Sequence, residues 1–310
     1  MKRIVLTIFV LLTFPVLFSP QVLNASERKT MKNDEVIVQF EESLRPVAAE
    51  VLRIFPAIKQ DLEQKLKSEM TFVPTIQLIR ERKRFQKIAN NSSVVTVAIA
   101  MANLIIIDNS KMKTHPFSLG VTLKHELCHL FLHEYVGQNK LPRWLNEGIS
   151  QWVSDGITEI LMGDDRDLLK KAILSGRHIP INRLMVQFPA DEHLLRLSYE
   201  ESKSIVEYII KEFGIDGVIS ILNNIKAGDP VESAIEKGLS ISTRELEERW
   251  HSYLKKRITW FTYFSSHIYE IIFSFAALIL TYGFIRFMIR KRAYKDDEDE
   301  ETDDEVEQVK

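Results

Sequence analysis

Two histidines and a glutamate stand close together in the stretch HELCH, which runs from His125 to His129. In an α-helix, residues four apart differ by about 40° in direction and about 6 Å in height, so both imidazoles can converge on one ion. Glu126 follows the first histidine and can take a proton from a water bound to that ion. Two neutral imidazoles suit Zn²⁺. The alternative is a structural helix with two hydrogen-bonded histidines.

A catalytic zinc site needs a third protein ligand besides the two histidines of an H-E-x-x-H helix. His133 lies eight residues after His125 and so about 12 Å away along a straight helix, which is too far. Glu147, in the stretch LPRWLNEGISQWV, follows His129 by 18 residues. A loop and a return onto a second helix would bring its carboxylate back to the ion.

The HExxH stretch followed by WLNEG resembles the gluzincins, and in particular peptidase MA-like domains and the aminopeptidase N family. The resemblance implies one Zn²⁺ per chain on His125, His129 and Glu147, with Glu126 as the general base. The stretch SYEESKSIVEYIIKEFG is similar to the YEKG helix of the same family. It implies that Tyr199 donates a hydrogen bond to the oxyanion of the tetrahedral intermediate.

Three departures from the aminopeptidase pattern bear on specificity and on the surroundings of the metal. The stretch IAMAN has Ala102 where the family's G-x-M-E-N run has the glutamate that binds a free amine. Gln151 stands where some gluzincins place a carboxylate that steadies a ligand histidine. Glu201 and Ser202 replace the Lys-Gly of YEKG. We therefore expect a peptidase that is not a strict aminopeptidase.

The composition is that of an ordinary globular protein with a nearly balanced charge. The 310 residues include 41 lysines and arginines against 43 aspartates and glutamates, which gives no sign of nucleic-acid binding. Cys128 is the single cysteine, so no intrachain disulfide is possible. Because it lies inside the motif on a different face from the histidines, we interpret it as a small core residue.

The middle of the chain, residues 29–257, predicts one α+β metallopeptidase domain, with a small sheet and an active-site helix followed by a helical subdomain. Residues 43–66 have helical spacing, and the Ile-rich runs at 75–80 and 103–109 are typical of strands. Residues 117–136 predict a buried helix that carries the motif. Further helices are expected from Ser202 to a break at Gly214, from Asp229-Pro230 to Gly238, and after a capping box at Ser242 and Glu245.

Both ends of the chain carry membrane signals. Residues 1–25 resemble a signal peptide, with Lys2 and Arg3 before an apolar stretch, although an uncleaved anchor is the alternative. Residues 268–289 are long and apolar enough for a transmembrane helix. Residues 290–310 form a basic and then acidic tail that we expect to be disordered. The basic residues after the span predict a cytoplasmic C-terminus and an extracytoplasmic catalytic domain.

These patterns together predict a membrane-anchored, zinc-dependent metallopeptidase that hydrolyses peptide bonds on the extracytoplasmic side. Its expected partners are a peptide or protein substrate and, through the C-terminal helix, the lipid bilayer. The alternative is a membrane-tethered binding or assembly module whose zinc site is structural or a relic. A relic site would be expected to have lost the base, because Glu126 has no role in merely holding a metal.

Overall fold

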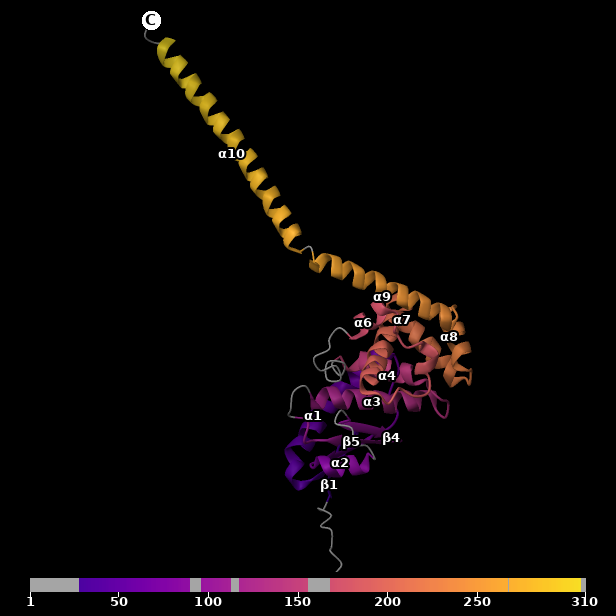
Figure 1. Cartoon of the computed structure of the whole chain (residues 1–310). Coiled ribbons are helices and arrows are strands. Elements are labelled where there is room, and N and C mark those ends of the chain that lie inside the picture. Colours follow the sequence, from indigo (N-terminus) through magenta and orange to yellow (C-terminus); the bar gives the residue numbers. More distant parts are fainter. Residues whose placement is uncertain (1–27, 90–95, 113–116, 156–167, 267, 308–310) are drawn as a thin grey trace, which may run out of the picture. The chain divides into compact units, whose positions relative to one another are not determined.

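A computed structural model of the chain describes residues 28–89, 96–112, 117–155, 168–266 and 268–307 (Figure 1). The expected signal peptide, residues 1–25, lies outside the described residues. The chain divides into two compact units, residues 1–131 and residues 132–310. The first contains a small mixed sheet and the second is helical, which confirms the mixed α+β class.

The sheet of the first unit has five strands in the order β1-β2-β3-β5-β4. These are β1 (Arg28–Lys32), β2 (Ile37–Glu41), β3 (Thr75–Ile79), β4 (Ala98–Met101) and β5 (Leu104–Asp108). Strands β2, β3 and β5 run parallel, while β1 and β4 are antiparallel to their neighbours and form the two edges. Strands β3 and β5 are buried except at their first residues, as expected for Ile-rich strands that are covered on both faces, whereas β2 alternates between buried and half-buried residues. The Ile-rich runs correctly predict β3 and β5, whereas the hairpin of β1 and β2 is not predicted by the sequence.

Helix α1 (Arg45–Leu66) follows a short 3-10 turn, η1 (Glu42–Leu44), and leads back to β3, so it forms the crossover that parallel strands require. Its buried residues recur three, four or seven apart and make one apolar stripe. The predicted helix over residues 43–66 is confirmed. Helix α2 (Arg82–Ile88) lies between β3 and β4 in sequence, and its Phe85 packs on Ile79 and Ile106 of the sheet.

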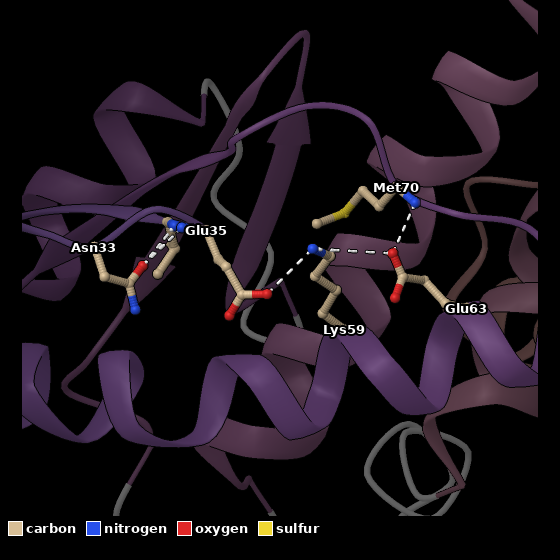
Figure 2. A network of polar contacts seen from close by, with 6 residues as sticks. Asn33, Glu35, Lys59, Glu63 and Met70 are labelled. Carbon is tan, nitrogen blue, oxygen red and sulfur yellow. Dashed lines mark hydrogen bonds and ion pairs between the residues drawn. The ribbon is translucent and has the colours of Figure 1, made fainter.

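A chain of polar contacts ties helix α1 to two connections of the sheet (Figure 2). The side chain of Asn33 accepts a hydrogen bond from the backbone N–H of Glu35 in the turn between β1 and β2. The carboxylate of Glu35 lies 3.1 Å from the ammonium of Lys59 on α1, and Glu63 accepts the N–H of Met70 at 2.8 Å. Because Lys59 also approaches Glu63 at 4.0 Å, these contacts fix both connections along one side of the helix.

Helix α3 (Leu119–Val136) carries the HELCH stretch. Leu123, Leu127, Cys128 and Leu132 are fully buried, which confirms the predicted buried helix and the core position of the cysteine. The helix ends where Gly137 adopts φ +66° and donates its N–H to the carbonyl of His133. This left-handed residue is the usual glycine C-cap, and it turns the chain toward the next helix.

The second unit consists of helices in the described residues. These are α4 (Arg143–Ser154), α6 (Leu168–Ser175), the 3-10 turn η2 (Ile181–Leu184), α7 (Glu192–Lys226), α8 (Val231–Leu239), α9 (Thr243–Ser266) and α10 (Ile268–Glu307). Their core includes the fully buried Trp144 and Trp250, and the indole of Trp250 donates to the hydroxyl of Ser204 at 3.1 Å. Helix α7 is interrupted at Gly214, whose φ of 71° and ψ of 175° confirm the predicted break.

Helix bounds in this unit differ from the sequence prediction in two places. Helix α7 begins ten residues before Ser202, because Asp191 caps it by accepting the N–H of Leu194. The predicted end of helix α8 at Gly238 is wrong by one residue. The helix ends at Leu239, and Ser240 forms the left-handed C-cap with φ 58°. A Cβ on Gly238 would lie 3.0 Å from the backbone of Ile221, so close helix packing explains this glycine. The cap at Ser242 is confirmed, since its hydroxyl accepts the N–H of Glu245.

Helix α10 contains the apolar segment Ile268–Met288, which has a mean hydropathy of 1.9 and is long enough to cross a membrane. None of this segment is buried inside the described protein. The helix continues as far as Glu307, through a stretch for which the sequence predicts a disordered tail. That stretch contains no Gly or Pro, and an existing helix supplies the nucleus that a separate segment would have to form.

Candidate metal centre

The two histidines of the HELCH stretch lie one turn apart on α3 and point the same way. Their Nε2 atoms are 3.1 Å apart, and the ring centroids are 4.6 Å apart with the planes at 89°. His125 is buried, while His129 is partly exposed. Two nitrogen ligands at about 2.0–2.1 Å on one tetrahedral ion are about 3.3 Å apart, so this pair has nearly the separation that Zn²⁺ requires.

Glu147 lies on α4, one turn after the start of the helix. Pro142 caps α4 in an extended conformation, and the buried side chains of Trp144 and Leu145 fix the rotation of the first turn. The carboxylate of Glu147 lies 3.9 Å from the guanidinium of Arg143, and its side chain is 13% exposed. A mostly shielded carboxylate at this position can accept a metal ion or hydrogen bonds.

The possible ligand atoms of His125, His129 and Glu147 all lie within 4.8 Å of one another. Two imidazole nitrogens and one carboxylate oxygen form the donor set of a catalytic zinc site, which leaves a fourth position for water or substrate. His133, which the spacing argument excluded, does not belong to this group. The residues present therefore fit one Zn²⁺.

Glu126 follows His125 on the same turn of α3 and is only 9% exposed. A carboxylate beside a metal site can act as a general base toward a bound water.

Tyr199 lies on α7 and is held from two sides. Its ring packs edge-on against Phe188, with centroids 5.2 Å apart and planes at 88°. Its backbone carbonyl accepts a hydrogen bond from the side-chain amide of Gln151 on α4 at 2.9 Å. The tyrosine is therefore tied to the helix that carries Glu147.

Residues 86–256 match the model of the Peptidase MA superfamily, which is more than half of the 310 residues. The chain belongs to the Peptidase MA superfamily. This membership supports a peptidase, and thus a hydrolase that takes a peptide substrate, at the level of the family. The stretch covered by the match contains the HExxH helix, the WLNEG helix and Tyr199.

Solved structures of metallopeptidases are similar to parts of this Peptidase MA chain. Native yeast LTA4 hydrolase has 13% identity and a TM-score of 0.45, with 73% of this chain and 38% of that chain covered. An M1 zinc metallopeptidase from Deinococcus radiodurans has 13% identity and a TM-score of 0.42, with 73% and 51% covered. This chain thus covers 38% of the length of yeast LTA4 hydrolase and 51% of the length of the Deinococcus radiodurans protein. The comparison with curated proteins found no match.

The stretch IAMAN forms edge strand β4 and the start of the turn to β5. Ala102 occupies this turn with φ +49°, a left-handed conformation that few residues with a Cβ adopt. The turn is fixed by Asn103, whose side-chain amide donates to the carbonyl of Val73 at 2.8 Å. The side chain at this turn position is the methyl group of Ala102, where the resemblance to the G-x-M-E-N run leads one to expect a glutamate.

Sequence reasoning missed two residues that shape this region. A Cβ on Gly148 would lie 2.3 Å from the carbonyl oxygen of Ser202, so only glycine lets α4 and α7 approach this closely. The guanidinium of Arg143 lies over the ring of Phe188, 4.7 Å from its centroid. The glycine of WLNEG was a signal for close helix packing, whereas nothing in the sequence indicated the Arg143–Phe188 contact.

Proposed function

We propose that this protein is a membrane-anchored zinc metallopeptidase that hydrolyses peptide bonds on the extracytoplasmic side. The observation that carries the proposal is the group of His125, His129 and Glu147, whose ligand atoms lie within 4.8 Å of one another. Glu126 stands beside them on the same helix as the two histidines. A purely structural site would need the ligands but would have no use for this base.

The three ligands would hold Zn²⁺, which supplies Lewis-acid polarisation of the scissile carbonyl and lowers the pKa of a water molecule. Glu126 accepts the proton of the attacking water and later gives it to the leaving amine, so that the carboxylate is regenerated. The phenol of Tyr199 donates a hydrogen bond to the carbonyl oxygen as negative charge develops on it. The ring contact with Phe188 restricts the phenol to few orientations, which favours such a role.

The sheet edge favours an extended peptide as the substrate. Strand β4 pairs only with β5 in the order of the described strands, and Met101 at its end is 48% exposed. Free backbone groups at such an edge can pair with a peptide by strand addition. Ala102 offers no charge to a free amine, so we expect internal or blocked peptides to be cut as well as free N-termini.

The apolar part of α10 favours the membrane anchor. No residue of the segment Ile268–Met288 is buried, and Phe273 and Tyr269 are 78% and 84% exposed. Exposure of so many apolar side chains to water is unfavourable, and contact with lipid would remove that cost. Arg290, Lys291 and Arg292 follow the segment, and the positive-inside rule places them in the cytoplasm.

The test uses the full-length chain in detergent, with zinc content and peptide turnover measured on the same preparations. Wild type should hold about one Zn²⁺, and His129→Ala or Glu147→Ala should lose it. Glu126→Gln should keep zinc and folding but cut a blocked peptide about 100-fold to 10,000-fold more slowly.

Two outcomes would contradict the proposal. Zinc content near zero after zinc-replete expression would remove the metal centre. A zinc-loaded wild type that cleaves nothing in a broad library of blocked and free peptides would favour the non-catalytic binding module instead.

A further inference from the structure

Arg143 is the first residue of α4, and its cation is held in place beside the proposed ligand Glu147. The backbone N–H of Arg143 donates to the carbonyl of Met185 at 2.8 Å. The guanidinium lies over Phe188, 4.7 Å from the ring centroid, and its Nε lies 3.9 Å from a carboxylate oxygen of Glu147. The side chain is 38% exposed. This is a cation with a fixed position and an accessible edge.

The stability of helix α4 does not account for this arginine. The N-terminus of a helix carries partial positive charge, so a cation in the first turn is unfavourable there. An acid–base pair four residues apart also stabilises a helix better with the acid first, whereas here the base comes first. The 3.9 Å separation from Glu147 is longer than a hydrogen bond. A stabilising surface pair therefore does not explain the position of Arg143.

The stacked arrangement leaves the hydrogen-bonding edge of the guanidinium available. Stacking on an aromatic ring uses one face of the planar group, while its N–H donors point outward in the plane. Within the described part of the chain, the side chain of Arg143 makes no hydrogen bond. A planar fork of donors matches a carboxylate, which can accept two parallel hydrogen bonds.

A pocket adjoins Arg143 on the side of its backbone partner. It has a volume of about 540 Å³ and includes Met185, whose carbonyl accepts the Arg143 N–H, and Asn146, which precedes Glu147. Its apolar lining comes from Val136, Leu141, Pro142, Val186 and Val231. The pocket is large enough for an amino-acid side chain, and its lining also includes the charged residues Lys140 and Glu232. Arg143 itself does not line the pocket but follows the lining residue Pro142, so a peptide with one residue in the pocket would bring the next residue toward the start of α4.

We propose that Arg143 binds a carboxylate of the peptide substrate and makes the enzyme prefer substrates that carry one. The inference rests on the proposed peptidase function, because it needs a peptide at the metal centre. It also accounts for Ala102: the chain has no carboxylate at the position that selects an amine, and it has a cation beside the proposed third ligand. The carboxylate is either the C-terminus of a short peptide or an Asp or Glu side chain.

The test compares four related peptides with blocked N-termini. One pair differs only in a free or amidated C-terminus, and the other pair, both amidated, differs only in an internal Glu or Gln. Binding is measured by calorimetry on the zinc-loaded full-length Glu126→Gln chain, with and without Arg143→Gln, and turnover on the chain with Glu126 intact. We expect one acidic peptide to bind about 10-fold to 100-fold more tightly than its neutral partner, and Arg143→Gln to remove that difference.

Arg244→Gln is the matched control, because Arg244 forms a similar pair with Glu248, four residues later at 3.7 Å, on α9. It should leave the preference intact. The pair of peptides that shows the preference identifies the C-terminus or the acidic side chain as the source.

Equal binding of acidic and neutral peptides by the parent protein, or an equal loss for both upon Arg143→Gln, would overturn the inference. If the protein cleaves neutral peptides and shows no preference for acidic ones, the proposed peptidase function holds and the inference about Arg143 fails. An Arg143-dependent preference in binding, in a protein that cleaves nothing, would instead refute only the peptidase.

Discussion

The side-chain amide of Gln151 on α4 donates a 2.9 Å hydrogen bond to the backbone carbonyl of Tyr199 on α7. Gln151 is fully buried and Tyr199 is partly buried, so removing this bond would leave a buried amide without this partner. It joins the helix of the proposed ligand Glu147 to the residue of the proposed oxyanion donor. The bond uses the backbone carbonyl of Tyr199, so it does not depend on the phenol.

Tyr199→Phe should lower kcat by about a hundredfold, because it removes one donor to the oxyanion. Zinc content and thermal stability should stay close to wild type, since the backbone bond from Gln151 and the ring contact with Phe188 both remain. Turnover of a blocked peptide, together with zinc analysis, measures this. Tyr253→Phe on α9 is the control and should leave kcat unchanged. Equal kcat for Tyr199→Phe and wild type would exclude the phenol from the reaction.

Gly148→Ala should lower the free energy of unfolding by about 1–3 kcal/mol or more, because its Cβ would meet the backbone carbonyl of Ser202 at 2.3 Å. Zinc affinity should fall as well, since Glu147 is the preceding residue. The matched control is Gly120→Ala on α3, where the nearest atom to a Cβ is 3.9 Å away, and it should be neutral or slightly stabilising. Thermal unfolding and zinc titration of both variants measure the difference. Equal stability of the two variants would contradict the close approach of α4 and α7.

Glu201 should make stability depend on pH. The pKa of this carboxyl is raised from 4.5 to about 8, mainly by burial; the hydrogen bond from the Ile179 N–H opposes the shift, and the nearby Glu247 and Glu200 contribute to it. Below about pH 4.5 the group is protonated in both folded and unfolded states. As the pH rises toward 8, only the unfolded state loses the proton, so stability falls, and above 8 the loss is complete.

Glu201→Gln should remove that part of the pH dependence and so raise the melting temperature relative to wild type most at pH 8–9. The variant cannot ionise, and its amide oxygen can still accept the Ile179 N–H, which lies 3.0 Å from the carboxyl of Glu201. Melting curves from pH 5 to 9 measure this, with Glu207→Gln, an exposed position on the same helix, as control. Parallel curves for wild type and Glu201→Gln would show that the carboxyl does not titrate in this range.

Of two reporters fused after Lys310, the one that requires the cytoplasm should be active and the one that requires the periplasm should be inactive. The reason is that the basic residues that follow the apolar segment resist translocation. When the reporter replaces the chain after Gly238, the periplasmic reporter should be active and the cytoplasmic reporter should be inactive. Paired fusions to a cytoplasmic and a periplasmic reporter measure this in bacteria. The opposite pattern would reverse the proposed orientation.

The sequence by itself determined the local chemistry of this protein. Residues four apart on a helix must share a face, so His125 and His129 could be paired, and Glu126 placed beside them, from spacing alone. Helical apolar spacing likewise predicted α1, apolar residues on most faces predicted the buried α3, and short Ile-rich runs predicted strands β3 and β5. Assignment to the peptidase MA-like domains came from HExxH and WLNEG, and the family match confirms it.

Only the tertiary structure decided the contacts between residues far apart in the chain. Strand β1, with the sequence RKTMK, has little apolar signal of its own, and its hairpin with the short β2 is recognisable only through the pairing of the two strands with the rest of the sheet. Gly148 and Gly238 lie against the backbones of neighbouring helices, and only the packing shows which backbone each glycine meets. The position of Arg143 over Phe188 depends on packing between segments 45 residues apart, and side-chain spacing carries information only within one helix or strand.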